Sequence, residues 1–141
     1  RQMHYDYIEG FVDYISQLRS NGVLTAVVTS SNQLKMESVY SQRTEFRSLF
    51  DAILTSEDFA ESKPSPDCYL RAAARFDRPR EQCVVFEDSI NGLRSGRAAG
   101  MMVVGLVTTN PREAVSPLSD YQTEDYNELD YKRLNELWQD I

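Results

Sequence analysis

Three short polar stretches of this 141-residue sequence carry side chains suited to handling a phosphate group. They are "TSSN" at 29–32, the lysine of "SKPSPDCYL" at 62–70, and "EDS" at 87–89. Thr29 and the backbone N–H groups after it can hydrogen-bond phosphate oxygens, Lys63 can neutralise their charge, and Asp88 offers the hard oxygen that Mg²⁺ prefers. The combination predicts phosphate chemistry assisted by magnesium, provided that the fold brings the three stretches together.

Lys63 lies in a stiff part of the chain. Pro64 and Pro66 each fix a backbone φ angle, so the ammonium leaves its loop from a defined position. Ser65 can cap a helix that starts at Pro66, and Asp67 suits the first turn of that helix. A surface lysine before a well-started helix is the alternative explanation of this stretch.

The other two stretches also have structural alternatives. "TSSN" is compatible with a turn from a strand into a helix, with Ser or Asn as the N-cap. "EDS" is compatible with a capping cluster favoured by the dipole of the next helix. Only the coincidence of all three stretches favours a functional site over these alternatives.

The elements that must position these residues follow from the pattern of apolar side chains. Short runs rich in β-branched residues predict buried strands at 23–29, 52–55, 83–86 and 102–107. Helical patterns alternate with these strands, which predicts an α/β fold with a mostly parallel sheet. Since ligands of such sheets bind at the carboxyl ends of the strands, and each polar stretch follows a strand, we expect one shared site there.

The helical patterns also set the extent of the domain. They cover 8–18, which Asn21-Gly22 ends, a weaker stretch near 36–40, the stretches 66–76 and 90–100, and a closing helix over 130–141. The stretch 108–128 is acidic and irregular. We therefore expect one domain over 1–141, with 108–141 as an acidic tail and closing helix.

Composition excludes several classes of partner. The chain is 41% hydrophobic and 26% charged, with a formal net charge of −7. An acidic chain without a Lys/Arg cluster is unsuited to nucleic acid or to an anionic membrane surface. No apolar run is long enough to span a bilayer, so we expect a cytoplasmic protein. The two cysteines resemble small core residues more than a disulfide framework or a metal site.

Three quoted segments together resemble a known family. "AVVTSSN", "SKPSPDCYL" and "VVFEDSINGLRSGRAAGM" are similar to the second, third and fourth motifs of haloacid dehalogenase superfamily hydrolases. The resemblance is to the branch with β-phosphoglucomutase and small sugar-phosphate phosphatases, and covers roughly residues 8 to 107. It implies a three-layer Rossmann-like core and Mg²⁺-dependent phosphoryl transfer through an aspartyl-phosphate.

The resemblance also implies roles for individual residues. Thr29 would bind the transferring phosphoryl group, with Ser30 contributing its backbone amide. Lys63 would bridge the phosphate and the nucleophile. Glu87 and Asp88 would hold Mg²⁺, with Asp88 as the direct ligand. The substrate would be a small phosphorylated metabolite, which the sequence does not name.

One motif of the family is absent from the sequence. The first motif, Asp-x-Asp on a central strand followed by a helical cap, supplies the nucleophile and the general acid, and no Asp-x-Asp occurs in these 141 residues. We therefore expect the C-terminal core of a longer phosphatase or phosphomutase, lacking its first strand and cap and inactive alone. The alternative is a catalytically inactive binding or interaction module with the same fold.

The missing strand has a structural consequence. In the resembled fold it lies between the strands that end at Thr29 and at Phe86. Its absence would leave two strand edges with unpaired backbone groups, which is unfavourable in water. We therefore expect the gap either to close by direct pairing of the two strands or to be filled by a partner chain.

Overall fold

The computed structural model describes residues 10–127 and 131–139. Strands and helices alternate along the chain, in agreement with the predicted α/β class. The strands are β1 (Ala26–Val28), β2 (Ala52–Leu54), β3 (Val84–Glu87), β4 (Met102–Leu106) and β5 (Tyr121–Thr123). The helices are α1 (Phe11–Ser20), α2 (Gln33–Gln42), α3 (Asp67–Arg75), α4 (Ile90–Ala98), α5 (Arg112–Val115) and α6 (Tyr131–Gln139).

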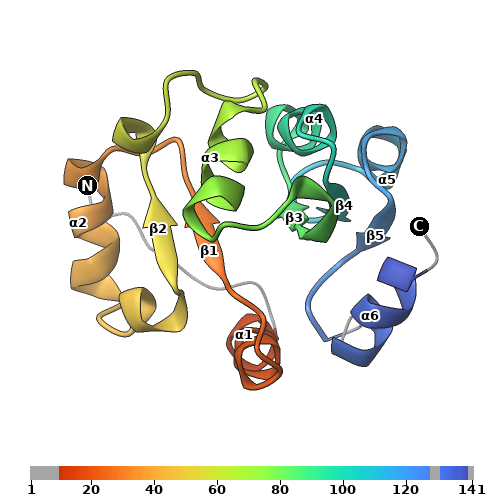
Figure 1. The fold of residues 1–141 in the computed structure, drawn as a ribbon, viewed down its shortest axis with the longest axis horizontal. Helices are drawn as coiled ribbons and strands as arrows, with labels where there is room; N and C mark the ends of the chain where they lie inside the picture. Colours follow the sequence, from red (N-terminus) through yellow and green to blue (C-terminus); the bar gives the residue numbers. More distant parts are fainter. Residues whose placement is uncertain (1–9, 128–130, 140–141) are drawn as a thin grey trace.

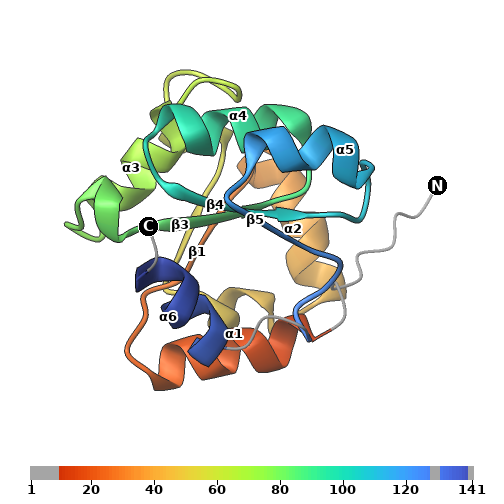
Figure 2. The same cartoon turned by 90° about the vertical axis from the view of Figure 1, so that its right-hand side faces the viewer.

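The elements form three layers around the strands. Helices α3, α4 and α5 lie on one face of the strands, and α1 and α6 lie on the other (Figure 2). All five residues of β4 are buried, as expected for a strand covered on both faces. None of the helices in the described ranges is long and apolar enough to cross a lipid bilayer.

The strands form two separate parallel sheets. In one, β1 pairs with β2 in the register Ala26↔Ala52; in the other, β4 lies between β3 and β5. Figure 1 shows β1 and β2 on one side of the molecule and β3 to β5 on the other. No ladder joins β1 to β3 among the described residues, so the first of the two expected outcomes, closure of the gap by direct pairing, is wrong. Filling of the gap by a partner chain stays a prediction.

Side-chain packing holds the two sheets in one molecule in place of that ladder. One apolar cluster contains Ile15 and Leu18 of α1 together with Phe50, Met102 and Val104, and partly buried residues of β1, β2 and β3 pack against it. On the other face, a second cluster joins α3 and α4 to β3 and β4. The helices therefore pack over both faces of the gap between β1 and β3.

The strand bounds differ from the expectation at two places. The strand β1 starts at Ala26, not at 23, because its partner β2 has only three residues and Val23 instead donates its N–H to the carbonyl of Leu18 at the end of α1. The stretch 108–128 is more ordered than predicted, since it contains α5 and β5. The expected closing helix is α6, and its predicted ends, 130 and 140–141, lie outside the described residues.

Candidate active site

Lys63 connects the ends of the two sheets. Its Nζ lies 3.2 Å from the carbonyl oxygen of Val28, the last residue of β1, and 2.9 Å from Oε2 of Glu87, the last residue of β3. The side chains of Lys63 and Glu87 are each only 12% exposed. The carboxyl ends of β1 and β3 therefore lie on either side of one largely buried cation.

Glu87 is held by several donors at once. Tyr69, on the first turns of α3, donates its hydroxyl to Oε2 over 2.7 Å. The other oxygen, Oε1, accepts from the backbone N–H groups of Asp88 and Ser89 at 3.1 and 3.3 Å, and from the Ser89 hydroxyl. Both carboxylate oxygens are thus occupied, which makes Glu87 an anchor for Lys63 in this arrangement.

These contacts shift the pKa values of Glu87 and Tyr69. Burial alone would raise the pKa of Glu87, but the Lys63 ammonium and the hydrogen bonds from Lys63 and Tyr69 outweigh it and hold that pKa below its usual range. Burial and the Glu87 charge raise the pKa of Tyr69. At neutral pH the site therefore contains a carboxylate at Glu87 and a neutral phenol at Tyr69.

Two of the predicted stretches, at 29–32 and 62–70, lie at the N-terminal ends of α2 and α3. Thr29 follows β1, and its hydroxyl accepts from the N–H of Ser31 at 3.1 Å, while Asn32 caps α2 by accepting from Lys35 at 2.8 Å. Ser65 accepts from the N–H of Asp67 at 3.2 Å. The helix α3 begins at Asp67, one residue later than expected, and Pro66 takes the N-cap position predicted for Ser65. The same stretches therefore cap or precede helices and also supply residues of the site, so the structural and the functional explanations of these stretches are compatible.

Asp88 is held by a segment that the sequence analysis missed. The hydroxyls of Thr109 and Thr108 donate to Oδ2 of Asp88 at 3.1 and 3.5 Å, and Nδ2 of Asn110 donates to its backbone carbonyl at 3.0 Å. This segment follows β4, so the rule that placed the other stretches at the carboxyl edge of the sheet also applies to it. Tyr69 was also missed as a site residue by the sequence analysis. Its position in α3, the helix that directly follows the Lys63 loop, was the signal that could have indicated it.

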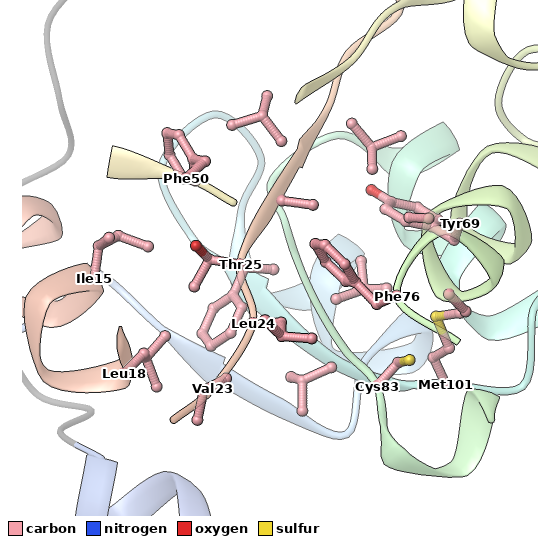
Figure 3. A pocket seen from close by; sticks show the side chains of 18 of the residues that line it. Ile15, Leu18, Val23, Leu24, Thr25, Phe50, Tyr69, Phe76, Cys83 and Met101 are labelled. Atoms are coloured by element: carbon pink, nitrogen blue, oxygen red, sulfur yellow. The ribbon is translucent and has the colours of Figure 1, made fainter. Parts of the chain in front are cut away.

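A cavity of about 770 Å³ lies between the two sheets. Its walls include Val28 of β1 and Phe86 of β3, and four of the predicted site residues line it, namely Thr29, Ser30, Lys63 and Glu87. Figure 3 shows Ile15 and Leu18 on one side of this cavity and Tyr69 and Phe76 on the other. Asp88 does not line the cavity, although it directly follows Glu87 in the chain.

The described residues of the site offer few side chains that could bind a metal ion. Within 10–127 and 131–139, no three side chains of His, Cys, Asp or Glu form a group that could hold one. Asp88 supplies the hard carboxylate oxygen that Mg²⁺ prefers. Because Mg²⁺ in proteins is bound through one or two carboxylates and keeps several waters, this donor set fits the ion as part of a site.

The chain is similar in sequence to a family of hydrolases and to several known proteins. Residues 4–100 match the model of haloacid dehalogenase-like hydrolases. The bifunctional riboflavin kinase/FMN phosphatase of Arabidopsis thaliana is 31% identical over 118 residues, which are 78% of this chain and 31% of that protein. Protein CbbY of Cereibacter sphaeroides is 36% identical over 99 residues, 67% of this chain and 42% of that one.

Solved structures show the same fold. A HAD hydrolase of family IA, variant 3, from Entamoeba histolytica superposes with a TM-score of 0.86 at 21% identity, over 94% of this chain and 60% of that one. CbbY from Rhodobacter sphaeroides in complex with phosphate gives a TM-score of 0.80 at 30% identity, over 91% and 58%. The chain thus spans about three fifths of these structures and a third to two fifths of the two relatives above.

Proposed function

The chain belongs to the haloacid dehalogenase-like hydrolase family, and on that premise we propose that it forms the phosphate- and metal-binding part of a phosphatase acting on small phosphate esters. The observation that carries the proposal is the position of Lys63 between the ends of β1 and β3. A largely buried ammonium at the carboxyl ends of β1 and β3 is suited to a phosphate dianion, because it can offset the phosphate charge in a site of low dielectric.

Each predicted residue has a role in this proposal. Thr29 and the N–H of Ser30 bind phosphate oxygens, and Lys63 neutralises charge on the transferring group. Asp88 is the direct Mg²⁺ ligand, and Glu87 fixes Lys63 beside it. When bound, Mg²⁺ would neutralise further negative charge on the phosphate. Sugar phosphates are the favoured substrate class, because CbbY of Rhodobacter sphaeroides, 31% identical, forms a complex with xylulose-(1,5)bisphosphate.

The nucleophile is proposed to come from a polypeptide segment outside these 141 residues, because they contain no Asp-x-Asp. We propose that the segment enters the cavity between the sheets as an extended, mainly apolar β-strand. That cavity is lined largely by apolar side chains of β1, β3, α1 and α3. A strand that ended beside Lys63 would place its last carboxylate next to the proposed phosphate site. A cytoplasmic location is part of the same proposal.

Backbone groups on both walls favour a strand over a small apolar ligand. Thr29 donates its N–H to Leu54 in β2, and Cys83 accepts from Met102 in β4. Since alternate residues of a strand direct their N–H and C=O groups to opposite edges, Ala26, Val28, Val84 and Phe86 direct theirs to the edges that face the cavity. Only the inserted backbone of a strand can pair with both rows.

Phosphate binding tests the first half of the proposal. Titration of the 141-residue chain with inorganic phosphate should shift the amide NMR signals of Thr29 and Ser30 at millimolar concentration. Lys63→Ala should abolish the shift, and Lys35→Ala, which removes an exposed lysine on α2, should leave it intact. Shifts that are equal in wild type and Lys63→Ala would refute a phosphate site at Lys63.

Complementation tests the second half. The polypeptide encoded upstream of Arg1 should contain Asp-x-Asp, and adding it should restore Mg²⁺-dependent hydrolysis of a generic phosphatase substrate. Amide exchange should then slow at Ala26, Val28, Val84 and Phe86, with Val27 and Val85 as internal controls on the edges that are already paired. An upstream sequence without Asp-x-Asp would support the alternative, an inactive binding module. Turnover by the 141-residue chain alone would mean that the nucleophile lies within it.

A further inference from the structure

We infer that the segment Thr108–Asn110 is a clamp that makes Asp88 a ligand through one oxygen only, and thereby favours Mg²⁺ over Ca²⁺. The inference rests on the proposed function in that Asp88 is taken as the metal ligand. The clamp itself consists of hydrogen bonds from three consecutive residues to Asp88. None of the three was a candidate in the sequence analysis.

The contacts of the clamp are asymmetric. Both threonine hydroxyls donate to Oδ2 of Asp88, Thr109 at 3.1 Å and Thr108 at 3.5 Å, and Asn110 holds the backbone carbonyl at 3.0 Å. No described residue donates to Oδ1. The side chain is therefore held by one oxygen, and the other oxygen is the one left for a cation.

The segment is anchored at both ends, so it can hold Asp88 in place. It follows β4, whose residues are all buried, and the ladder to β5 continues through Val107, which donates its N–H to Thr123 at 2.8 Å. After Asn110 the chain enters α5, where fully buried Val115 lies so close to Gly105 that a Cβ there would overlap it. A segment fixed on both sides loses little further freedom when its hydroxyls bind Asp88.

The coordination chemistry of the two cations gives the clamp its consequence. Mg²⁺ requires near-octahedral geometry at about 2.0–2.1 Å, and it is bound by single carboxylate oxygens and waters. Ca²⁺ takes six to eight ligands and often binds both oxygens of one carboxylate. With Oδ2 committed to two hydroxyls, Asp88 can satisfy the first ion without rearrangement, whereas two-oxygen binding of Ca²⁺ would require the hydroxyl bonds to break.

The test is a comparison of cation affinities in the full 141-residue chain. The affinities for Mg²⁺ and for Ca²⁺ are measured by NMR titration at the Asp88 and Ser89 amides. In Thr108→Val/Thr109→Val the preference for Mg²⁺ over Ca²⁺ should fall severalfold, mainly because Ca²⁺ binds more tightly. The single variant Thr109→Ser keeps a hydroxyl and should retain the preference, and Thr44→Val, at an exposed threonine, is the matched control.

Two results would overturn the inference. One is an unchanged cation preference in the double valine variant, and the other is a wild-type chain in which neither cation shifts the Asp88 signals. A failure of the proposed phosphate site is seen separately, because inorganic phosphate then leaves Thr29 and Ser30 unshifted while the cation preference is still measurable. A double-mutant cycle between Thr109→Val and Asp88→Asn should also show coupling of about three- to tenfold in the unfolding constant.

Discussion

The phenol of Tyr69 lies 2.7 Å from Oε2 of Glu87, the same oxygen that accepts from Lys63 at 2.9 Å. Lys63 Nζ also lies 5.2 Å from the centroid of the Tyr69 ring. Three side chains from β3, α3 and the loop before α3 thus form one contact group.

Tyr69→Phe should weaken the folded state and loosen Lys63. The change leaves the ring in place but removes one donor from a largely buried carboxylate, so we expect a loss of about 1–2 kcal/mol in the free energy of unfolding. Inorganic phosphate should also bind less tightly. Tyr40→Phe is the control, because the Tyr40 ring stacks on Arg47 and no described hydrogen bond uses its hydroxyl. Equal urea midpoints for the two variants would contradict the prediction.

Lys63→Met should destabilise the chain by on the order of 3 kcal/mol, because it leaves the Glu87 charge largely buried without its cation. Lys63→Met/Glu87→Gln should recover most of that loss, since Gln is neutral and can still accept from Tyr69. Phosphate binding should stay lost in both variants. Chemical denaturation and phosphate titration separate the two roles of Lys63. A double variant as unstable as the single one would show that packing, and not charge, is responsible.

Gly92→Ala should destabilise the chain although it lies inside α4. Helix propensity alone predicts a gain of about 1 kcal/mol for this change. A Cβ at Gly92, however, would overlap the side chain of Glu87, so the carboxylate would have to leave its position between Lys63 and Tyr69. We expect a net loss of about 1–3 kcal/mol.

The control for this prediction is Asn91→Ala, which is exposed on the same helix and should be neutral or slightly stabilising. In a background of Glu87→Ala the overlap disappears, so Gly92→Ala should then be tolerated. Thermal unfolding of the four proteins of this cycle measures the difference. If Gly92→Ala were stabilising in the wild-type background, the close approach of Glu87 to α4 would be wrong.

Asp51 should make stability depend on pH below about 5. Its carboxylate accepts from the N–H and hydroxyl of Thr25 at 2.7 and 3.1 Å and pairs with Arg19, and the backbone bond from Thr25 is the main cause that lowers the pKa of Asp51. A folded pKa below the unfolded value means that the stabilisation is complete above the unfolded pKa, near 3.9. It is lost as the pH falls through the folded pKa.

The measurement is urea unfolding of wild type and Asp51→Asn at several pH values. The variant should be less stable by about 1–2 kcal/mol at pH 7, and the difference should shrink towards pH 2. Glu37→Gln, at an exposed position on α2, should show no such convergence. A difference that stays constant over this range would contradict the role of Asp51.

The sequence was informative where chemistry and periodicity agreed. Continuous apolar runs predicted β2, β3 and β4 to within a residue or two, and the carboxyl-edge rule brought Lys63 and Glu87 into contact. The strand β5 was missed because Tyr121–Thr123 is short and polar, and its partner β4 decides its conformation. Direct pairing of β1 with β3, one of the two expected outcomes, was predicted from unpaired backbone groups alone, without the helices that pack over both faces of the gap.

The division into two sheets has a mechanical consequence for Lys63. Within a ladder, neighbouring strands are held about 4.8 Å apart by hydrogen bonds. The spacing between β1 and β3 has no such fixed value, because packed side chains of α1, α3 and α6 determine it. The two acceptors of Lys63, at Val28 and Glu87, belong to different sheets. A change of side-chain volume in the remote apolar cluster, at Leu18 for example, is therefore transmitted as a change in the distance that one ammonium must bridge.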